Sequence, residues 1–149
     1  MTQVDTTSAP AAGSTRSPLF AALTGVTALG VLLQAISAGA FMALRHSGAG
    51  WTDVHDIVAD VTLVAALATA IVGLAVKRRA QPAVAWGAVV LFVLLVAQVV
   101  IGHLITDADL DGLVAVHVPL ALIVFGLTVW LSIRASTRGR SAERTPQQP

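Results

Sequence analysis

Residues 80–106 read AQPAVAWGAVVLFVLLVAQVVIGHLIT, and no Asp, Glu, Lys or Arg interrupts them. A helix needs roughly 20 apolar residues to cross a hydrocarbon core of about 30 Å, and this segment is longer than that. Because lipid offers no hydrogen bonds, every backbone polar group of a single span has to be bonded within the segment, as in a helix. The stretch therefore predicts one membrane-spanning helix.

Three further segments of the same kind accompany it. Residues 17–44 and 112–133 carry no charge, and residues 57–76 carry only Asp60. The chain of 149 residues is 56% hydrophobic and only 11% charged, which excludes an ordinary soluble globular domain. We predict an all-α integral membrane protein, an antiparallel bundle of four transmembrane helices at about 18–44, 53–76, 82–106 and 112–133.

The basic residues give the expected orientation. Eight of the nine lie on the side of the two termini and of the connection around Lys77, and only Arg45 lies at the opposite end. Because basic residues mark the cytoplasmic side, both termini are expected in the cytoplasm of a bacterium, with the chain in its plasma membrane. We divide the chain into a disordered tail (1–17), the four-helix transmembrane domain (18–135) and a basic disordered tail (136–149).

All four histidines fall at the predicted outer end, a placement that points to a metal or haem because imidazole is a common ligand for both. The chain has no cysteine, so disulfides, iron–sulfur clusters and covalently attached c-type haem are excluded. Any haem would be held by coordination and packing alone. The histidines are His46, His55, His103 and His117.

The two halves of the chain resemble each other. Each has an apolar run with a single glutamine, Gln34 or Gln98, followed by a helix whose outer end carries a histidine. Gln34 precedes His55 by 21 positions, and Gln98 precedes His117 by 19. Two such halves would be related by an axis along the membrane normal and would place both histidines at similar depth. Two imidazoles could then approach one porphyrin from opposite faces.

The motifs Gln98-Val99-Val100-Ile101-Gly102 and His117-Val118-Pro119-Leu120-Ala121 resemble one four-helix half of the haem A synthase family. They also resemble small bacterial four-helix membrane proteins with that layout. The resemblance implies axial histidines at His55 and His117. Haem A synthases have two such halves, and this chain has one. Their second helix begins with a Glu-x-x-His element, and this chain has Thr52 at the position of the glutamate. An electron carrier is therefore expected rather than a haem-hydroxylating enzyme.

We interpret His55 and His117 as the metal ligands of a b-type haem between helices 2 and 4. Arg45 and His46 are the expected partners of its propionates, because charge-assisted bonds hold carboxylates, and His103 would pair with His46 or lie at a haem edge. Asp60 would orient a histidine or mark a proton route. The glutamines are expected to bond between helices, with a haem-edge or quinone contact as the second interpretation.

Two other functions stay open from the sequence. One is an outer-face divalent-metal site, which would bring Asp107, Asp109 and Asp111 together with the histidines. The other is an accessory or structural protein whose histidines bind nothing. The expected partners are the lipid bilayer, a membrane redox partner or quinone, and a second copy of the chain. Nothing in the sequence supports nucleic-acid binding. Small residues at four-residue spacing predict close contacts between helices, although an Ala-rich chain can produce such spacing by chance. These residues are Ala35, Gly39, Ala65, Thr69 and Gly73.

Overall fold

The computed structural model describes residues 17–44 and 50–137, and this part of the chain is helical apart from short connections. The elements, in order, are α1 (Pro18–Leu44), α2 (Trp51–Lys77), α3 (Pro82–Asp107), a short 3₁₀ helix η1 (Asp111–Leu113) and α4 (Val114–Thr137). The prediction of four long helices is confirmed, and each is long and apolar enough to cross a membrane. α1 and α3 begin at the predicted prolines, whereas α4 continues four residues beyond the predicted end at 133. Most of the predicted tails lies outside the described residues.

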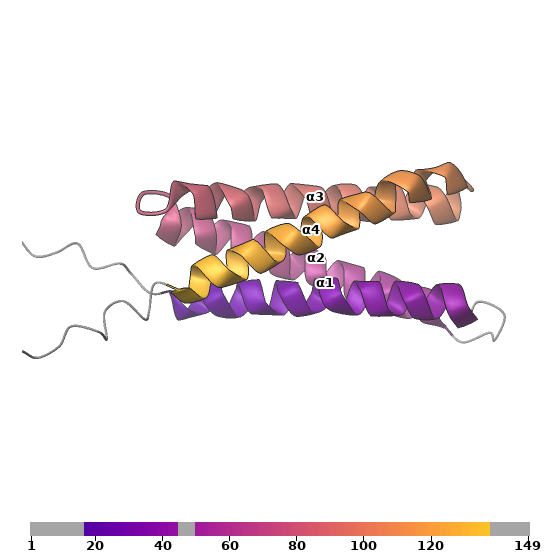
Figure 1. The fold of residues 1–149 in the computed structure, drawn as a ribbon, viewed down its shortest axis with the longest axis horizontal. Coiled ribbons are helices and arrows are strands. Elements are labelled where there is room, and N and C mark those ends of the chain that lie inside the picture. The colour runs from indigo at the N-terminus through magenta and orange to yellow at the C-terminus, as the bar shows by residue number, and fades with distance from the viewer. Residues whose placement is uncertain (1–16, 45–49, 138–149) are drawn as a thin grey trace, which may run out of the picture.

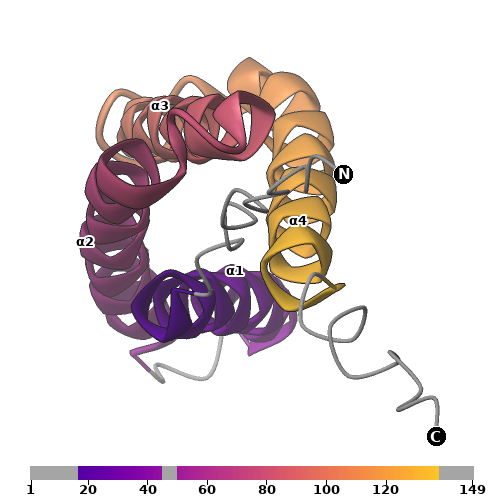
Figure 2. The ribbon, with the colours of Figure 1, turned by 90° about the vertical axis from the view of Figure 1, so that its left-hand side faces the viewer.

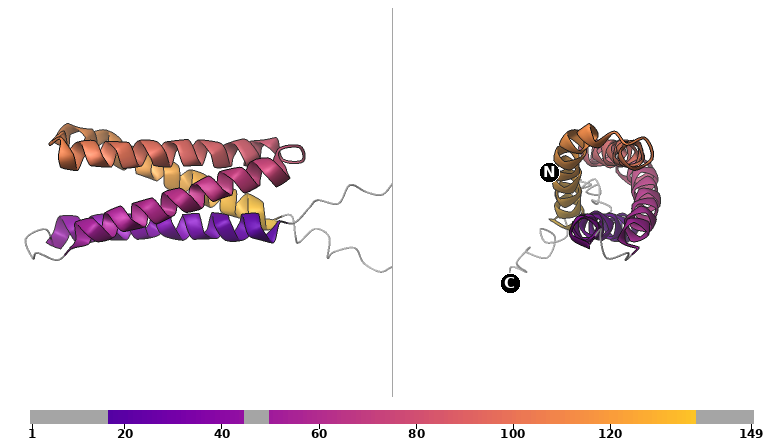
Figure 3. Two further views of the ribbon diagram at one scale, coloured as in Figure 1. Left: turned by 180° about the vertical axis from the view of Figure 1, so that it is seen from behind. Right: turned by 90° about the vertical axis from the view of Figure 1, so that its right-hand side faces the viewer.

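The four helices form a ring in which each helix packs against its two neighbours (Figures 1 and 2). Consecutive helices are antiparallel. α2 runs obliquely from beside α1 to beside α3, and α4 runs obliquely from beside α3 to beside α1 (Figures 1 and 3). Within the described residues the diagonal pairs, α1 with α3 and α2 with α4, do not pack against each other. Side chains of all four helices fill the space between them and form one core cluster.

The bundle buries several threonine hydroxyls while large apolar side chains face outward, unlike a soluble bundle. Thr24, Thr27, Thr69 and Thr128 are fully buried, whereas Leu122 is 70% exposed and many other large apolar side chains face outward. The buried threonines satisfy their hydroxyls locally: each donates a hydrogen bond to the carbonyl four residues earlier, at 2.6–2.9 Å. A surface of this kind is stable only against an apolar solvent or partner.

Two glycines mark close approaches of α2 to its neighbours. Gly30 of α1 lies against the side chain of Thr62, and Gly73 of α2 lies under the ring of Phe20, with 3.1 Å from its Cβ position to Phe20 Cε2. The predicted contacts at Ala65, Thr69 and Gly73 are confirmed, because all three are buried. The contacts predicted at Ala35 and Gly39 are wrong within this chain, because both residues are exposed and no atom lies near a Cβ placed on Gly39.

The apolar core does not extend along the whole bundle. Its buried members end at Val31 on α1, Ala65 on α2, Leu95 on α3 and Val124 on α4. Toward the end that carries the histidines, the buried side chains of the described residues are polar: Ser37, Thr62 and Gln98. At that end α1 and α2 form one hairpin and α3 and α4 form the other, and the two hairpins splay apart (Figure 1).

Candidate functional site

His55 and His117 lie at the same end of the bundle, on helices that face each other across a diagonal. His55 is in the second turn of α2 and His117 is in the first turn of α4. Both side chains are partly buried, and the two imidazoles are close enough to interact electrostatically. The two helices thus place both histidines at the same end of the bundle, and their pairing on one iron stays a prediction.

The backbone of each histidine is held by the glutamine of the preceding helix. Gln34 Nε2 donates to the carbonyl oxygen of His55 at 2.6 Å, and Gln98 Nε2 donates to the carbonyl oxygen of His117 at 3.1 Å. The interhelical role predicted for the two glutamines is confirmed. The same bond occurs in both halves, so the weak repeat in the sequence corresponds to a repeated contact in space.

Ser37 fixes the ring of His55. Its hydroxyl donates to the carbonyl oxygen of Gln34 at 3.1 Å and lies 3.0 Å from His55 Nδ1. When the single hydroxyl hydrogen is directed at the Gln34 carbonyl, the serine oxygen accepts a bond from His55 Nδ1–H, and Nε2 then carries the lone pair. A histidine that binds a metal through Nε2 needs this arrangement.

Sequence analysis missed Ser37. Its distance of three residues from Gln34 was the available signal, because residues one helical turn apart share a face. The role of orienting a histidine had been considered for Asp60 instead. Asp60 is exposed on α2, and the Nδ1 atom of His55 is bonded to Ser37.

The ring of His117 sits in a different environment. Its Nδ1 is buried and has no hydrogen-bond partner among the described residues, and the same holds for Gln98 Oε1. A Cβ atom on Gly102 of α3 would lie 3.8 Å from His117 Cε1, so the glycine leaves room beside the ring. The two histidines are therefore alike in backbone position and unlike in the partners of their rings.

The remaining predicted site residues do not join this pair in the described structure. His103 is exposed near the end of α3, where its Nδ1 lies 3.3 Å from Asp107 Oδ2. Arg45 and His46 lie outside the described residues, so their predicted contact with propionates stays a prediction. Within residues 17–44 and 50–137, no three His, Asp or Glu side chains gather as a divalent-metal site would require.

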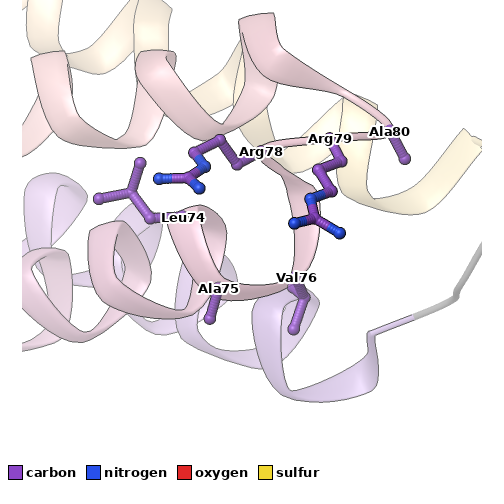
Figure 4. A pocket seen from close by; sticks show the side chains of 6 residues that line it. All are labelled: Leu74, Ala75, Val76, Arg78, Arg79 and Ala80. Atoms are coloured by element: carbon purple, nitrogen blue, oxygen red, sulfur yellow. The ribbon is translucent and has the colours of Figure 1, made fainter.

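A surface hollow of about 510 Å³ lies at the opposite end of the bundle, around the connection from α2 to α3. Arg78 and Arg79 line it together with Leu74, Ala75, Val76 and Ala80 (Figure 4). It contains no histidine and is separated from the His55–His117 pair by the length of the helices, so it is not part of the candidate site. Comparison with known protein families, with curated proteins and with solved structures finds no match to this chain.

Proposed function

We propose that this chain is an integral membrane protein that binds one b-type haem between α2 and α4, with His55 and His117 as the axial ligands, and transfers electrons. The observation that carries the proposal is the position of the two imidazoles. They come from diagonal helices at the end of the bundle where the apolar core stops.

The membrane location is supported by the polarity of the bundle. Four helices of sufficient length expose large apolar side chains and bury threonine hydroxyls. Apolar surface costs about 25 cal/mol per Å² in contact with water, so an exterior of this kind favours lipid as the surrounding solvent. The expected orientation, with both termini in the cytoplasm, rests on the distribution of the basic residues alone.

Three features of the described residues fit a porphyrin. The hairpins α1–α2 and α3–α4 splay apart at the histidine end (Figure 1), and no buried apolar side chain fills that end. The Nε2 atom of His55 is left free by the bond of Nδ1 to Ser37. The glutamine bonds hold both histidine carbonyls in place, which limits the movement of the rings that the backbone carries.

When bound, haem supplies a one-electron redox centre, and two imidazole ligands leave its iron without an open position, which suits electron transfer better than oxygen chemistry. The protein would contribute ligand orientation through Ser37, Gln34 and Gln98. A quinone or a membrane redox protein is the expected exchange partner.

The test is an optical spectrum of protein purified in mild detergent from haem-replete cells, oxidised and then reduced with dithionite. Sharp reduced α and Soret bands that are lost or strongly shifted in both His55→Ala and His117→Ala are expected. His103→Ala is the matched control, because His103 is exposed on α3, and it should retain the bands. A featureless spectrum from folded protein would refute the proposal and favour an accessory role.

A further inference from the structure

The α3–α4 half of the bundle contains two buried polar atoms that lack a partner among the described residues, Gln98 Oε1 and His117 Nδ1. Buried polar atoms in folded proteins are almost always hydrogen-bonded, either to protein or to ordered water. Gln98 is only 9% exposed, so bulk solvent does not satisfy its oxygen. Both atoms belong to one pair of contacting residues, and each needs a hydrogen-bond partner.

The two atoms belong to residues that are already bonded to each other. Gln98 Nε2 donates to the carbonyl oxygen of His117, and Oε1 is attached to the same amide carbon as Nε2. A single water molecule joins two polar atoms through bonds of about 2.8 Å each. It can donate to the glutamine oxygen and either donate to or accept from a ring nitrogen, which gives it the two or more partners that a buried water needs.

The other half shows what fills the equivalent position. In the α1–α2 half, the Ser37 hydroxyl bonds to His55 Nδ1. Ser37 follows Gln34 by three residues, and the residue three after Gln98 is Ile101. An isoleucine offers no hydrogen bond, so the repeat itself predicts an imidazole nitrogen without a side-chain partner in the α3–α4 half.

We propose that one buried water molecule bridges Gln98 Oε1 and His117 Nδ1, in place of the hydroxyl that Ser37 supplies beside His55. The consequence is that the two histidines are unequal. A Ser37 hydroxyl that is also bonded to the Gln34 carbonyl favours one tautomer of His55, whereas a water molecule both donates and accepts freely, so His117 exchanges between its two tautomers. This concerns the chain before any haem binds, and it can hold or fail separately from the proposed function.

The experiment is long-range ¹H–¹⁵N correlation NMR of the full chain, labelled with ¹⁵N-histidine and kept free of haem in detergent micelles. Single His→Gln variants assign the four rings. We expect His55 to show one tautomer, and His117 to show averaged nitrogen shifts and a cross-peak to water. Ser37→Ala should abolish the single tautomer of His55, and Ser37→Thr should keep it. Thr24→Val removes a buried hydroxyl elsewhere on α1 and should change nothing.

The decisive variant is Ile101→Ser, which adds the missing hydroxyl. We expect it to convert His117 to one tautomer and to remove the water cross-peak, and Ile101→Thr should do the same while keeping a branched side chain. A His117 ring that already has one tautomer and no water cross-peak in the unmodified chain would overturn the proposal. So would folded Ile101→Ser and Ile101→Thr proteins in which the water cross-peak persists unchanged.

Discussion

Gly30 lies where α1 comes closest to α2, and we expect Gly30→Ala to destabilise the bundle. A Cβ atom at this position would overlap Thr62 Oγ1 and lie 3.0 Å from both Cβ and Cγ2 of Thr62. Comfortable contact between carbon atoms is about 3.5–4.0 Å, so the helices would have to separate locally by about 0.5–1 Å. Thr62 cannot swing aside easily, because it is buried, branched at Cβ and bonded to the carbonyl oxygen of Val58 at 2.6 Å.

The size of the effect follows from two opposing terms. Overpacking of a closed interface lowers the free energy of unfolding by about 1–3 kcal/mol, and replacing a helical glycine by alanine raises it by up to about 1 kcal/mol. The bond from Gln34 to the carbonyl of His55 lies one turn further along α1, and stretching it costs about 0.6 kcal/mol more. We therefore expect a net loss of about 1–2 kcal/mol in the free energy of unfolding, together with weaker haem binding.

The assay is reversible unfolding by SDS in mixed micelles, followed by the fluorescence of the three tryptophans. Gly25→Ala is the matched control on the same helix, because no atom lies within 4 Å of its Cβ position. It should be neutral or slightly stabilising. In the double variant Gly30→Ala/Thr62→Ala the overlap with Oγ1 and the contact with Cγ2 are gone and only the 3.0 Å approach to the Cβ of residue 62 remains, so the loss relative to Thr62→Ala should be smaller than the loss that Gly30→Ala causes in the unmodified chain. If Gly30→Ala unfolds like Gly25→Ala, the close approach of α1 to α2 is not as described.

Three further predictions test other parts of the molecule. Gly87→Ala places a methyl group 2.8 Å from Trp130 Cζ3, so the free energy of unfolding should fall by about 1–2 kcal/mol in the same assay. Gly126→Ala is the control, because the space around Gly126 is open, and it should not be destabilised. Equal unfolding midpoints for the two variants would contradict the α3–α4 packing. In haem-loaded protein, His117→Ala should open one coordination position and allow the reduced form to bind carbon monoxide, seen as a Soret shift. An unmodified chain that binds carbon monoxide equally well would argue against two imidazole ligands. Because the chain has no cysteine, single cysteines introduced at Ala80 and Ala108 report the orientation of the protein in the membrane. A membrane-impermeant maleimide should label Ala108→Cys in intact cells and Ala80→Cys only after lysis. The reverse labelling pattern would invert the expected topology.

The helices were predictable because their signal is the absence of charge, which does not depend on how they pack. Pro18 and Pro82 marked the starts of α1 and α3, since proline is tolerated at the first helical position. The end of α4 was less predictable, because Arg134 is charged and yet continues the helix, stacked over the ring of Trp130 at 5.6 Å. A charge ends the apolar segment but does not end the hydrogen bonding of the backbone.

The inward faces could not be predicted in the same way. A helix that is apolar all round has no amphipathic pattern to show which side is buried, so Ala35 with Gly39 had the same weight as Ala65 with Gly73. Only the second pair proved to be an interface. Ser37 was missed for the same reason: no amphipathic pattern marked its side of α1 as buried, and its spacing of three residues from Gln34 was the one signal for its contact with His55.

The repeated glutamine contact shows which distances the fold maintains. The spacing from glutamine to histidine differs by two residues between the halves, yet in both the glutamine amide reaches the histidine carbonyl. In the α3–α4 half, α3 ends at Asp107, Asp109 lies in the left-handed region at φ 53°, Leu110 N–H bonds back to the Leu104 carbonyl at 3.2 Å, and η1 leads into α4. Asp tolerates the left-handed conformation better than most residues, so the chain can turn sharply there. The contact between glutamine and histidine is thus kept in both halves although their spacing along the sequence differs.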